Sequence, residues 1–534
     1  MFSRESSFLY HHWHRCCSKA DAAAMDAMSD TEAAEAFQQL PAFGTGGIRK
    51  KMGIGPNRIN EITIGWVAAA LAAVLQEKHT GEALNRGVLI AYDTRQHSAD
   101  FAAAAAEVLA AAGIPTVTLA EPMPVPLLSF VLRRGDYLCG IMITASHNPG
   151  SDNGIKIYNS RGGQLVPAEA APIEEKLGNI DPFTVARCPR SRGEAAGLIR
   201  YSGKAEAAAY LSALCTAKAP AKLTIVATPL HGAAKVLLPQ ALGRCGHRVL
   251  SVPEQEITDG TFATVAAPNP EDPAVFALAK EYAGKAGADL ILATDGDGDR
   301  CGCCIPRGKD YAPLNGNETA MLLLRYLLER EKAHLPKDGY ILRTNVSTTL
   351  GDGIAAAYGL KTYTTPTGFK YIGAALDDPA KGTFFAGYEE SGGFLFQDHA
   401  ADKDGIATAV LLAEAAAAAK AKGRSLWEEQ KEFYRRYGYE YTATKTFGFE
   451  EEGRAKACMK ALAALEREGI KKEVTATTVT FLFPHQSKTT LRLSGTEPKL
   501  KLYYQIPARN HAEAKEREQQ LDAVFLPIIG GFLP

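Results

Sequence analysis

The feature that most constrains this fold is an alternation of short apolar runs with Ala-rich helical stretches, which starts afresh twice along the chain. The first series contains the apolar runs Val88–Tyr92, Thr116–Leu119 and Leu138–Ile143, and the Ala-rich stretch Phe101–Ala112. The second contains Leu223–Ala227, Val249–Val252 and Leu290–Ala293, and the third contains the helix Thr319–Glu331 and the strand Tyr340–Arg343. Strands that alternate with helices are typical of α/β domains. Three units of similar size predict an internal repeat.

The pattern changes near Tyr437, where a different kind of domain is expected. A Lys/Glu-rich helix, Glu451–Glu468, is followed by the predicted strands Val474–Phe483, Leu491–Leu493 and Lys501–Ile506 and by a final helix from His511. Helices beside a small antiparallel sheet describe an α+β domain. A chain of 534 residues is also too long for one core. We therefore predict an α/β protein of four domains, with boundaries 1–203, 204–316, 317–434 and 435–534.

Composition narrows the class of protein. The 59 Lys and Arg residues nearly cancel the 60 Asp and Glu residues, so the net charge of −1 argues against nucleic acid or a membrane surface as the partner. No apolar run approaches the roughly 18–20 residues of a membrane span, and the N-terminus lacks the apolar core of a secretory signal. A cytoplasmic enzyme is expected. The group Cys301, Cys303 and Cys304 lacks a second ligand pair at zinc spacing, and buried strand residues are the preferred interpretation.

The stretch Thr144–Gly150 follows the buried run Leu138–Ile143 and delivers Ser146 at the end of a strand. Asn148, Pro149 and Gly150 force a turn there. Ligands of open α/β sheets bind at the carboxyl ends of strands, so this hydroxyl is a candidate nucleophile. An ordinary Ser/Asn/Pro turn is the alternative.

Asp295, Asp297 and Asp299 alternate with glycines directly after the apolar run Leu290–Ala293. Three carboxylates this close repel one another unless a cation neutralises them. Hard oxygen ligands suit Mg²⁺. The sequence therefore predicts a magnesium site, with a solvated acidic turn as the alternative.

Two further loops offer groups that hold phosphate. The Gly-rich stretch Phe43–Arg49 exposes backbone N–H groups beside the Arg49 guanidinium. Guanidinium, hydroxyl, backbone and ammonium donors gather in a second loop at Arg492, Ser494, Gly495, Thr496 and Lys501. A plain turn and a surface hairpin are the respective alternatives. Glu389 and Ser391, between glycines, could bond neighbouring sugar hydroxyls. Together these groups indicate phosphoryl transfer with Ser146 as the carrier.

Four motifs in this order resemble the α-D-phosphohexomutase family, from about Phe43 to Gln505. They are Thr-Ala-Ser146-His-Asn-Pro, Asp295-x-Asp-x-Asp-Arg300, Gly387-Tyr-Glu-Glu-Ser391 and Arg492-x-Ser-Gly-Thr-Glu-Pro498. Phe43–Gly53, Thr367-Gly-Phe-Lys370 and Asp402-Lys-Asp-Gly405 are similar to the branch of that family that contains phosphoglucomutases and phosphopentomutases. Gly296 departs from the proline usual there.

The resemblance implies four domains around a central cleft, the first three being similar mixed α/β sandwiches. It implies that Ser146 is phosphorylated and binds one Mg²⁺ per chain with Asp295, Asp297 and Asp299. The phosphoryl group would pass to the 6-hydroxyl of glucose 1-phosphate, and the resulting glucose 1,6-bisphosphate would turn over and return its 1-phosphate to Ser146. The implied catalytic residues are Ser146, Lys156, His147 and Arg49, and the implied substrate-binding residues are Arg300, Thr367, Gly368, Lys370, Glu389 and Ser391. The loop with Arg492, Ser494, Gly495, Thr496 and Lys501 would hold the non-reacting phosphate, and its domain would close to exclude water.

Alternatives remain at this point. The same mechanism serves mannose and pentose phosphates, a metal-dependent phosphatase would use Ser146 only transiently, and a non-catalytic sugar-phosphate binder would not need it. The expected partner is a small-molecule sugar phosphate, and the expected state is a monomer or homodimer.

Overall fold

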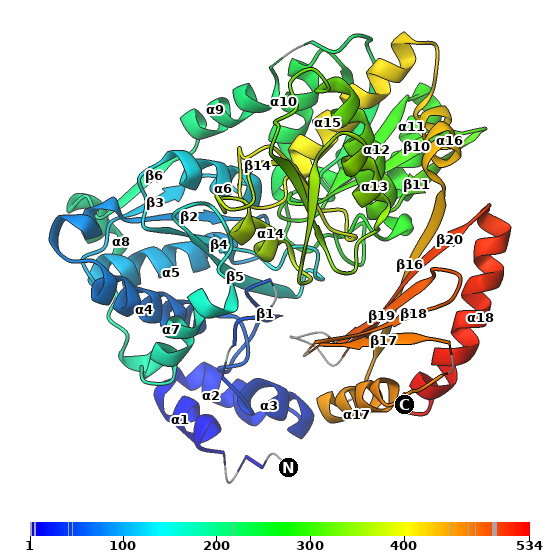
Figure 1. Ribbon diagram of the computed structural model, residues 1–534. Coiled ribbons are helices and arrows are strands. Elements are labelled where there is room, and N and C mark those ends of the chain that lie inside the picture. Colours follow the sequence, from blue (N-terminus) through cyan, green and yellow to red (C-terminus); the bar gives the residue numbers. More distant parts are fainter. Residues whose placement is uncertain are drawn as a thin grey trace.

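The computed structural model describes residues 3–4, 7–40, 42–44, 46–216, 218–449, 451–467, 469–475, 477–493 and 499–533, with the side chain of residue 452 excepted. The strands of these residues form four sheets, three mixed and one antiparallel (Figure 1). Each sheet lies inside one of the four predicted ranges, and the predicted fold class is confirmed. The boundary residues themselves stay a prediction.

The first part contains an N-terminal group of helices and a six-stranded sheet. The helices are α1 (Phe8–Cys16), α2 (Lys19–Asp26) and α3 (Asp30–Phe37). The sheet has the order β1-β5-β4-β2-β3-β6 and consists of β1 (Ile48–Lys51), β2 (Val88–Tyr92), β3 (Thr116–Leu119), β4 (Cys139–Ile143), β5 (Asp152–Asn159) and β6 (Ile199–Ser202). The α-helices of the first sheet region are α4 (Glu61–Lys78), α5 (Ser98–Ala111), α6 (Val125–Arg134), α7 (Pro167–Leu177) and α8 (Arg190–Ala195).

Strand β2 explains why this sheet is covered on both faces. Its alternating side chains point to opposite faces. Val88 and Ile90 join one apolar cluster with α4 and α5, while Leu89 and Ala91 join another with α6. A strand that is apolar at successive positions is typical of a sheet buried between two layers of helices.

The second and third parts are built in the same way. The second sheet, in the order β11-β10-β9-β7-β8, contains β7 (Thr224–Thr228), β8 (Arg248–Ser251), β9 (Leu290–Thr294), β10 (Cys301–Arg307) and β11 (Asp310–Leu314). The third, in the order β13-β12-β14-β15, contains β12 (Gly339–Thr344), β13 (Lys361–Thr365), β14 (Thr383–Tyr388) and β15 (Phe394–Phe396). Their α-helices are α9 (Lys204–Leu214), α10 (Leu237–Arg244), α11 (Ala277–Ala286), α12 (Gly316–Arg330), α13 (Leu350–Ala357), α14 (Phe369–Ala375), α15 (Gly405–Ala421) and α16 (Leu426–Tyr437).

The three mixed sheets share one four-stranded core, which confirms the predicted repeat. In each, the first strand pairs in parallel with the second and third strands of the core, and the fourth strand returns antiparallel to the third. These cores are β2, β3, β4 and β5 in the first sheet, β7, β8, β9 and β10 in the second, and β12, β13, β14 and β15 in the third. The loop between the third and fourth strands of each core carries Ser146, the three aspartates or Glu389, respectively. These three candidate loops therefore occupy equivalent places in the repeat.

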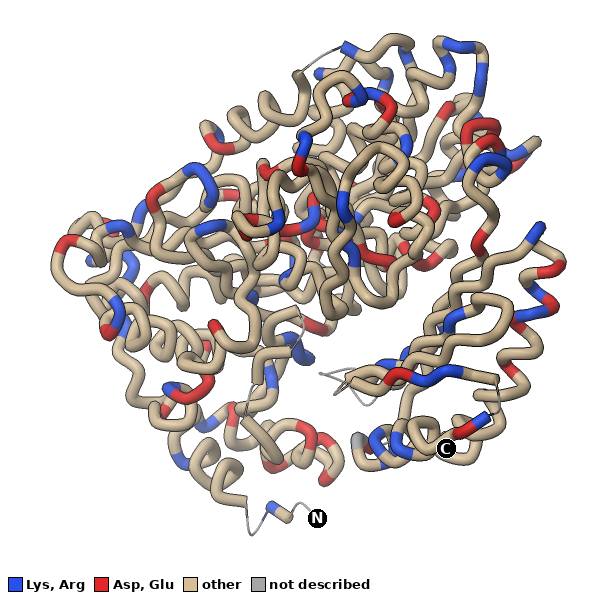
Figure 2. The backbone as a smooth tube through the Cα atoms, viewed as in Figure 1, with Lys and Arg blue, Asp and Glu red and all other residues tan. Residues whose placement is uncertain are grey.

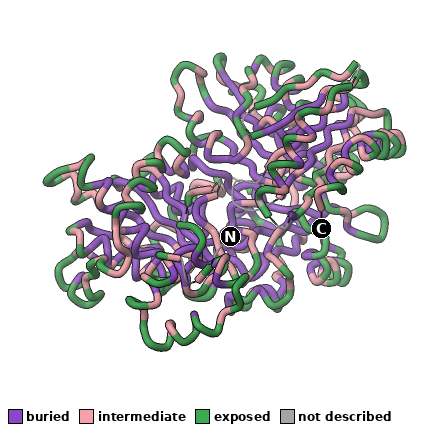
Figure 3. The backbone as a smooth tube through the Cα atoms, turned by 90° about the horizontal axis from the view of Figure 1, so that it is seen from below, coloured by how far each residue is buried: buried purple, intermediate pink, exposed green. Residues whose placement is uncertain are grey.

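The repeats are not separate bodies. One apolar cluster runs through residues of all three mixed sheets, and α15, which follows the third sheet in the chain, packs on β9 and β10 of the second. Figure 3 shows mostly buried backbone in the interior and exposed backbone along the outer loops. The continuous core fixes the three loops relative to one another.

The fourth part is an antiparallel sheet covered on one face. Its elements are β16 (Tyr439–Gly448), α17 (Glu452–Ala463), β17 (Lys471–Val474), β18 (Thr478–Leu482), β19 (Lys488–Leu493), β20 (Lys499–Ala508) and α18 (His511–Gly530). Val479, Phe481, Leu491 and Leu502 pack against α17 and α18. Lys488 donates to the Asn345 carbonyl at 2.7 Å and so joins this sheet to the third.

Three sequence-based expectations were wrong in detail. The predicted strand Val474–Phe483 is interrupted: Val474 is the last residue of β17, and β18 begins at Thr478, whose backbone N–H donates to the Thr475 hydroxyl at 3.0 Å. The predicted helix Glu451–Glu468 ends earlier, as α17. Helix α12 starts before Thr319, because Asn315 and Glu318 cap it reciprocally. The three clustered cysteines lie buried in β10, as expected. Among the described residues, no helix is both long and apolar enough to cross a bilayer.

Candidate active site

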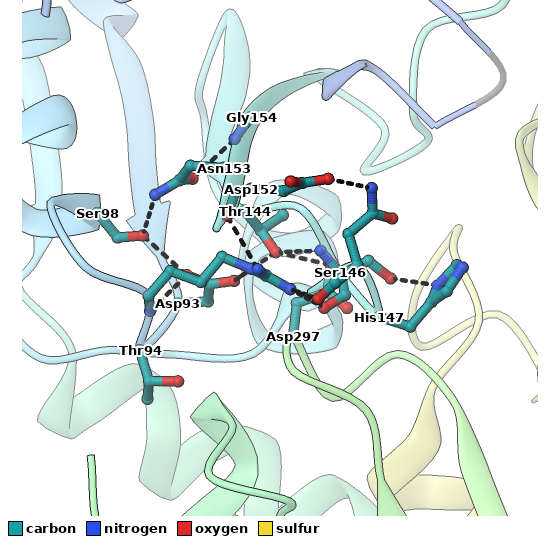
Figure 4. Close-up of polar contacts among 12 residues, drawn as sticks. Asp93, Thr94, Ser98, Thr144, Ser146, His147, Asp152, Asn153, Gly154 and Asp297 are labelled. Atoms are coloured by element: carbon teal, nitrogen blue, oxygen red, sulfur yellow. Dashed lines mark hydrogen bonds and ion pairs between the residues drawn. The ribbon is translucent and has the colours of Figure 1, made fainter. Parts of the chain in front are cut away.

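Ser146 lies just beyond the end of β4, with its backbone in the left-handed region at φ 53°. Few residues other than glycine adopt this conformation, which costs of order 1–3 kcal/mol and is held by surrounding contacts. Thr144 supplies one of them, since its hydroxyl accepts the Ser146 N–H at 2.8 Å and donates to Asp93 at 2.6 Å (Figure 4). The turn therefore holds the Ser146 hydroxyl in a fixed place.

Arg95 fixes the rest of this loop, and sequence reasoning missed it. Its guanidinium donates to the backbone carbonyls of Ser146 and Asn148, both at 2.7 Å, and to those of Pro149 and Asp152 at 2.6 and 2.9 Å. Asp93 neutralises it, with 3.2 Å between Arg95 Nε and Asp93 Oδ2. Both side chains are buried. The only sequence signal for this role was the motif Asp93-Thr94-Arg95 after a strand, and such a motif can occur in any loop.

The three aspartates meet the Ser146 loop from the second sheet. The Ser146 hydroxyl donates to Asp295 Oδ2 at 3.0 Å, and one oxygen from each of Asp295, Asp297 and Asp299 lies within 4.8 Å of the others. All three side chains are buried. Gly296 allows the close approach, because a Cβ there would lie 2.6 Å from the Ser146 carbonyl oxygen.

This arrangement fits a divalent cation. Asp297 Oδ1 and Asp299 Oδ1 are buried without a hydrogen-bond partner in the part of the chain that the structure describes. Burial, together with the charges of Asp299 and Asp297, holds the pKa of Asp295 well above its usual value. Buried carboxylates with free oxygens that face one point form a Mg²⁺-type ligand set.

Two lysines partly neutralise the negative charge of the three aspartates. Lys156 Nζ, on β5, donates to Asp297 Oδ2 at 2.7 Å and Asp299 Oδ2 at 3.2 Å. Lys403 Nζ lies 2.9 Å from Asp299 Oδ2 and 3.3 Å from Asp402 Oδ1. Although burial opposes it, the charges of Lys403, Lys156 and Arg300 lower the pKa of Asp299. Lys403 was recognised only as part of a family motif, without a role.

The remaining candidates line a cleft of about 910 Å³ next to this centre. Its wall includes Arg49, His147, Arg300, Thr367, Gly368, Lys370, Glu389, Ser391, Arg492 and Lys501. Ser146, Lys156 and the three aspartates lie buried behind this wall, where His147 Nδ1 is 3.3 Å from Ser146 Oγ. Ser494, Gly495 and Thr496 lie outside the described residues.

The cleft is basic. Lys50 and Lys51 from β1, Lys403 near the third sheet and Lys499 from β20 add to the cations already named, and Figure 2 marks the basic residues of β1, β19 and β20. Burial, together with Arg300, Arg49 and Lys501, lowers the pKa of His147 well below its usual value. Burial and Arg492 likewise lower the pKa of Lys370. A concave, positively charged site attracts anionic ligands.

Comparison with known proteins matches nearly the whole chain. Three family profiles, described as alpha/beta/alpha domains I, II and III of phosphoglucomutase/phosphomannomutase, match residues 40–183, 205–308 and 315–437. The chain is 30% identical to a phosphoglucomutase of Staphylococcus saprophyticus, over 94% of this chain and 96% of that one. It is 29% identical to a phosphopentomutase of Mus musculus, over 92% and 88%. A solved structure from Thermus thermophilus, provisionally named a phosphomannomutase, is 25% identical with a TM-score of 0.70, over 90% of this chain and 99% of that one.

Proposed function

The chain belongs to the phosphoglucomutase/phosphomannomutase family of α-D-phosphohexomutases and is a mutase, and on that premise we propose that it interconverts α-D-glucose 1-phosphate and glucose 6-phosphate through a phosphoserine at Ser146. The single observation that carries the proposal is the 3.0 Å hydrogen bond between the Ser146 hydroxyl and Asp295, beside a cluster of three buried carboxylates. A serine joined to such a cluster at the edge of a basic cleft is suited to carry a phosphoryl group.

In the first step the phosphoryl group leaves Ser146 and joins the 6-hydroxyl of bound glucose 1-phosphate. The bond from phosphorus to Ser146 Oγ breaks and a bond to the sugar O6 forms. Lys156 is the proposed proton carrier: as a neutral amine it takes the O6 proton and passes it to Ser146 Oγ. Its Nζ lies 2.7 Å from Asp297 and 3.2 Å from Asp299 beside the reacting serine. His147 and Arg49 assist from the cleft wall.

In the second step the bisphosphate reverses its orientation in the cleft. The bond between phosphorus and O1 breaks, Ser146 Oγ gives its proton to Lys156 as it accepts the phosphoryl group, and Lys156 passes a proton to O1. Glu389 and Ser391 hold sugar hydroxyls in both orientations. Arg492 and Lys501, with Ser494, Gly495 and Thr496, hold the phosphate that is not reacting. Two phosphate-binding regions in one cleft let either end of the sugar face the serine.

The residues that would hold Mg²⁺ are Asp295, Asp297, Asp299 and Ser146, one ion per chain. Bound there, the cation offsets the charge of the phosphoserine and withdraws charge from the transferring group. The unpartnered oxygens of Asp297 and Asp299, among the residues described, support this assignment. Arg95 keeps the loop in register with these carboxylates through its bonds to backbone carbonyls.

Glucose is preferred because phosphoglucomutases of three staphylococci are 30% or 32% identical to the chain. Mannose phosphate and a pentose phosphate are the alternatives, because relatives named phosphomannomutase and phosphopentomutase are 30% and 29% identical. Turnover assays on the three 1-phosphates rank them. A near-zero net charge argues against nucleic acid or a membrane surface as the partner. A small-molecule sugar phosphate as the partner, a cytoplasmic location and a monomeric or homodimeric state complete the proposal.

The test combines intact mass with turnover. One phosphate per chain, localised to Ser146 and lost on incubation with excess unphosphorylated glucose, is the expected mass result. Ser146→Ala removes the phosphate and lowers turnover by at least about 10³-fold. Ser212→Ala, which changes an exposed helical serine, serves as the matched control and keeps wild-type turnover. Wild-type turnover in Ser146→Ala contradicts the proposal, and steady phosphate release without isomerised product identifies a phosphatase instead.

A further inference from the structure

A second cavity of about 370 Å³ lies away from the cleft, where α12, α15 and α16 meet the first residues of β16. Most of its wall is apolar and includes Met321, Leu350, Ala418 and Phe433. Its volume lies in the range of small-molecule sites, which are mostly apolar with a few polar groups that fix orientation. None of the groups assigned above to phosphoryl transfer lines it.

One polar group in this wall is unsatisfied. Gln430, on α16, is 4% exposed. Its amide nitrogen donates to the Tyr434 hydroxyl at 2.9 Å, which in turn donates to Glu318 Oε1 at 2.9 Å. Gln430 Oε1, in contrast, is buried and has no hydrogen-bond partner in the described part of the chain. A buried acceptor without a hydrogen bond destabilises the folded protein, and a donor supplied by a ligand would remove that cost.

Two carboxyl groups line the same cavity. Glu318 and Glu440 both belong to its wall, and Glu440 accepts a hydrogen bond from the Thr348 hydroxyl. Burial raises the pKa of both. Within the described residues neither has a cationic side chain within 4.0 Å, whereas the two arginines of the same wall are paired, Arg325 with Glu429 at 2.7 Å and Arg330 with Glu414 at 2.5 Å. The wall therefore has spare acceptors, and its four glutamates outnumber its two arginines and Lys422.

We propose that this cavity binds a small primary amine with an apolar body. The three N–H donors of an ammonium group match the acceptors of Gln430, Glu318 and Glu440, and the apolar body replaces water against Met321, Leu350 and Phe433. A carboxylate would meet like charge at the polar residues. A neutral alcohol would satisfy Gln430 without compensating the glutamates.

The position of the cavity allows a bound ligand to influence the cleft. Glu440 and Thr442 come from β16, while the rest of the wall, mostly helical, comes from segments that precede the connection at Gly438, whose φ is 91°. A ligand there contacts both sides of the link that carries the C-terminal sheet with Arg492 and Lys501. A ligand that prefers one orientation of that sheet shifts the population toward it. This effect on the cleft rests on the function proposed above, whereas binding of the amine does not.

Titration calorimetry without sugar phosphate tests the proposal, with 2-phenylethylamine as the probe. We expect binding of one amine per chain, and at least about tenfold weaker binding of 2-phenylethanol and 3-phenylpropanoate, which is about 1.4 kcal/mol. Equal binding of the alcohol or the acid overturns the assignment, as does absence of amine binding.

Two pairs of variants locate the amine. Ala418→Phe fills the cavity and should weaken amine binding at least about tenfold, whereas Ala421→Phe, at an exposed position of the same helix outside the wall, should leave it unchanged. Glu440→Gln should weaken the amine more than the alcohol. Unchanged amine binding in Ala418→Phe or Glu440→Gln contradicts the proposal. Because no turnover is measured, the result is independent of the mutase reaction.

Discussion

Arg95 Nη2 donates a 2.7 Å hydrogen bond to the carbonyl oxygen of Ser146, so a buried guanidinium holds the backbone of the proposed nucleophile. The same side chain bonds Asn148, Pro149 and Asp152. The loop is therefore kept in shape by a residue on another strand end, 51 positions earlier in the chain.

Arg95→Lys should therefore damage both stability and turnover. One ammonium group cannot bond the four carbonyls that a planar guanidinium spans. It also neutralises the charge of Asp93 less completely than the guanidinium does. We expect a loss of about 3 kcal/mol in the free energy of unfolding and at least about tenfold lower kcat. Urea unfolding and steady-state kinetics measure the two effects. Arg187→Lys, at a partly exposed arginine, is the control, and wild-type kcat in Arg95→Lys would refute the clamp.

Asp295→Asn should change stability in opposite directions with and without metal. Without metal the substitution removes one of three mutually repelling buried carboxylates, and a gain of about 1 kcal/mol is expected. With Mg²⁺ at about 100 times its Kd, the wild type should gain about 2.7 kcal/mol, and the variant much less. Thermal unfolding with EDTA and with Mg²⁺ measures both. Equal Mg²⁺ stabilisation of the two proteins would contradict the metal assignment.

Gly296→Ala should lower kcat. The added Cβ would lie 2.6 Å from the Ser146 carbonyl oxygen and 3.3 Å from Pro268 Cγ, so the serine loop has to shift. Displacement of a reacting group by about 1 Å costs on the order of 10²-fold in rate. Gly284→Ala, in helix α11 with no atom within 4 Å of the new Cβ, is the matched control. Equal kcat in both variants would show that the loop tolerates a side chain there.

Lys501→Ala should act mainly on substrate binding. Lys501 lines the cleft on β20, apart from the serine and its carboxylates. Loss of one charge-assisted phosphate contact of about 1.5–3 kcal/mol predicts KM higher by about tenfold or more, with a smaller change in kcat. Steady-state kinetics with glucose 1-phosphate separate the two constants. A fall in kcat at unchanged KM would place Lys501 in the chemical step instead.

Glu390→Gln should be more stabilising at high pH than at low pH. Burial and the charge of Glu389 raise the pKa of Glu390 to about 7, so the folded state keeps a proton that the unfolded chain releases near pH 4.5. The stabilising contribution of the protonated group is fully present below about pH 4.5, and it is lost as the pH rises through about 7. Gln keeps a neutral group throughout. Urea unfolding at about pH 5 and about pH 8, with the exposed Glu82→Gln as control, measures the difference, and a pH-independent effect would be inconsistent with the raised pKa.

The parts of this molecule that were predictable are those with local signals. Leu138–Ile143 and Leu290–Ala293 are apolar runs that end in polar, Gly-rich loops, and both proved to be strands delivering candidate groups. The helix start at Asn315 and the turn at Thr475 depend on single side-chain bonds that periodicity does not register. The roles of Arg95 and Lys403 could not be predicted from the sequence, for another reason. Their partners are far away in the chain, and only the folded topology brings them together.

Strand β5 carries a consequence for synthesis of the chain. Lys156 and Tyr158 stand two residues apart on it, yet their acceptors Asp297 and Asp402 follow 141 and 244 residues later. On the ribosome, the residues of the first sheet are therefore synthesised before Asp297 and Asp402. Until Asp297 has been made, Lys156 is without that carboxylate acceptor. The buried charges around Ser146 and Lys156 are complete only after Asp402, which follows the third sheet, has been made. A chain that stalls before the second sheet carries Ser146, the proposed nucleophile, without its partner Asp295.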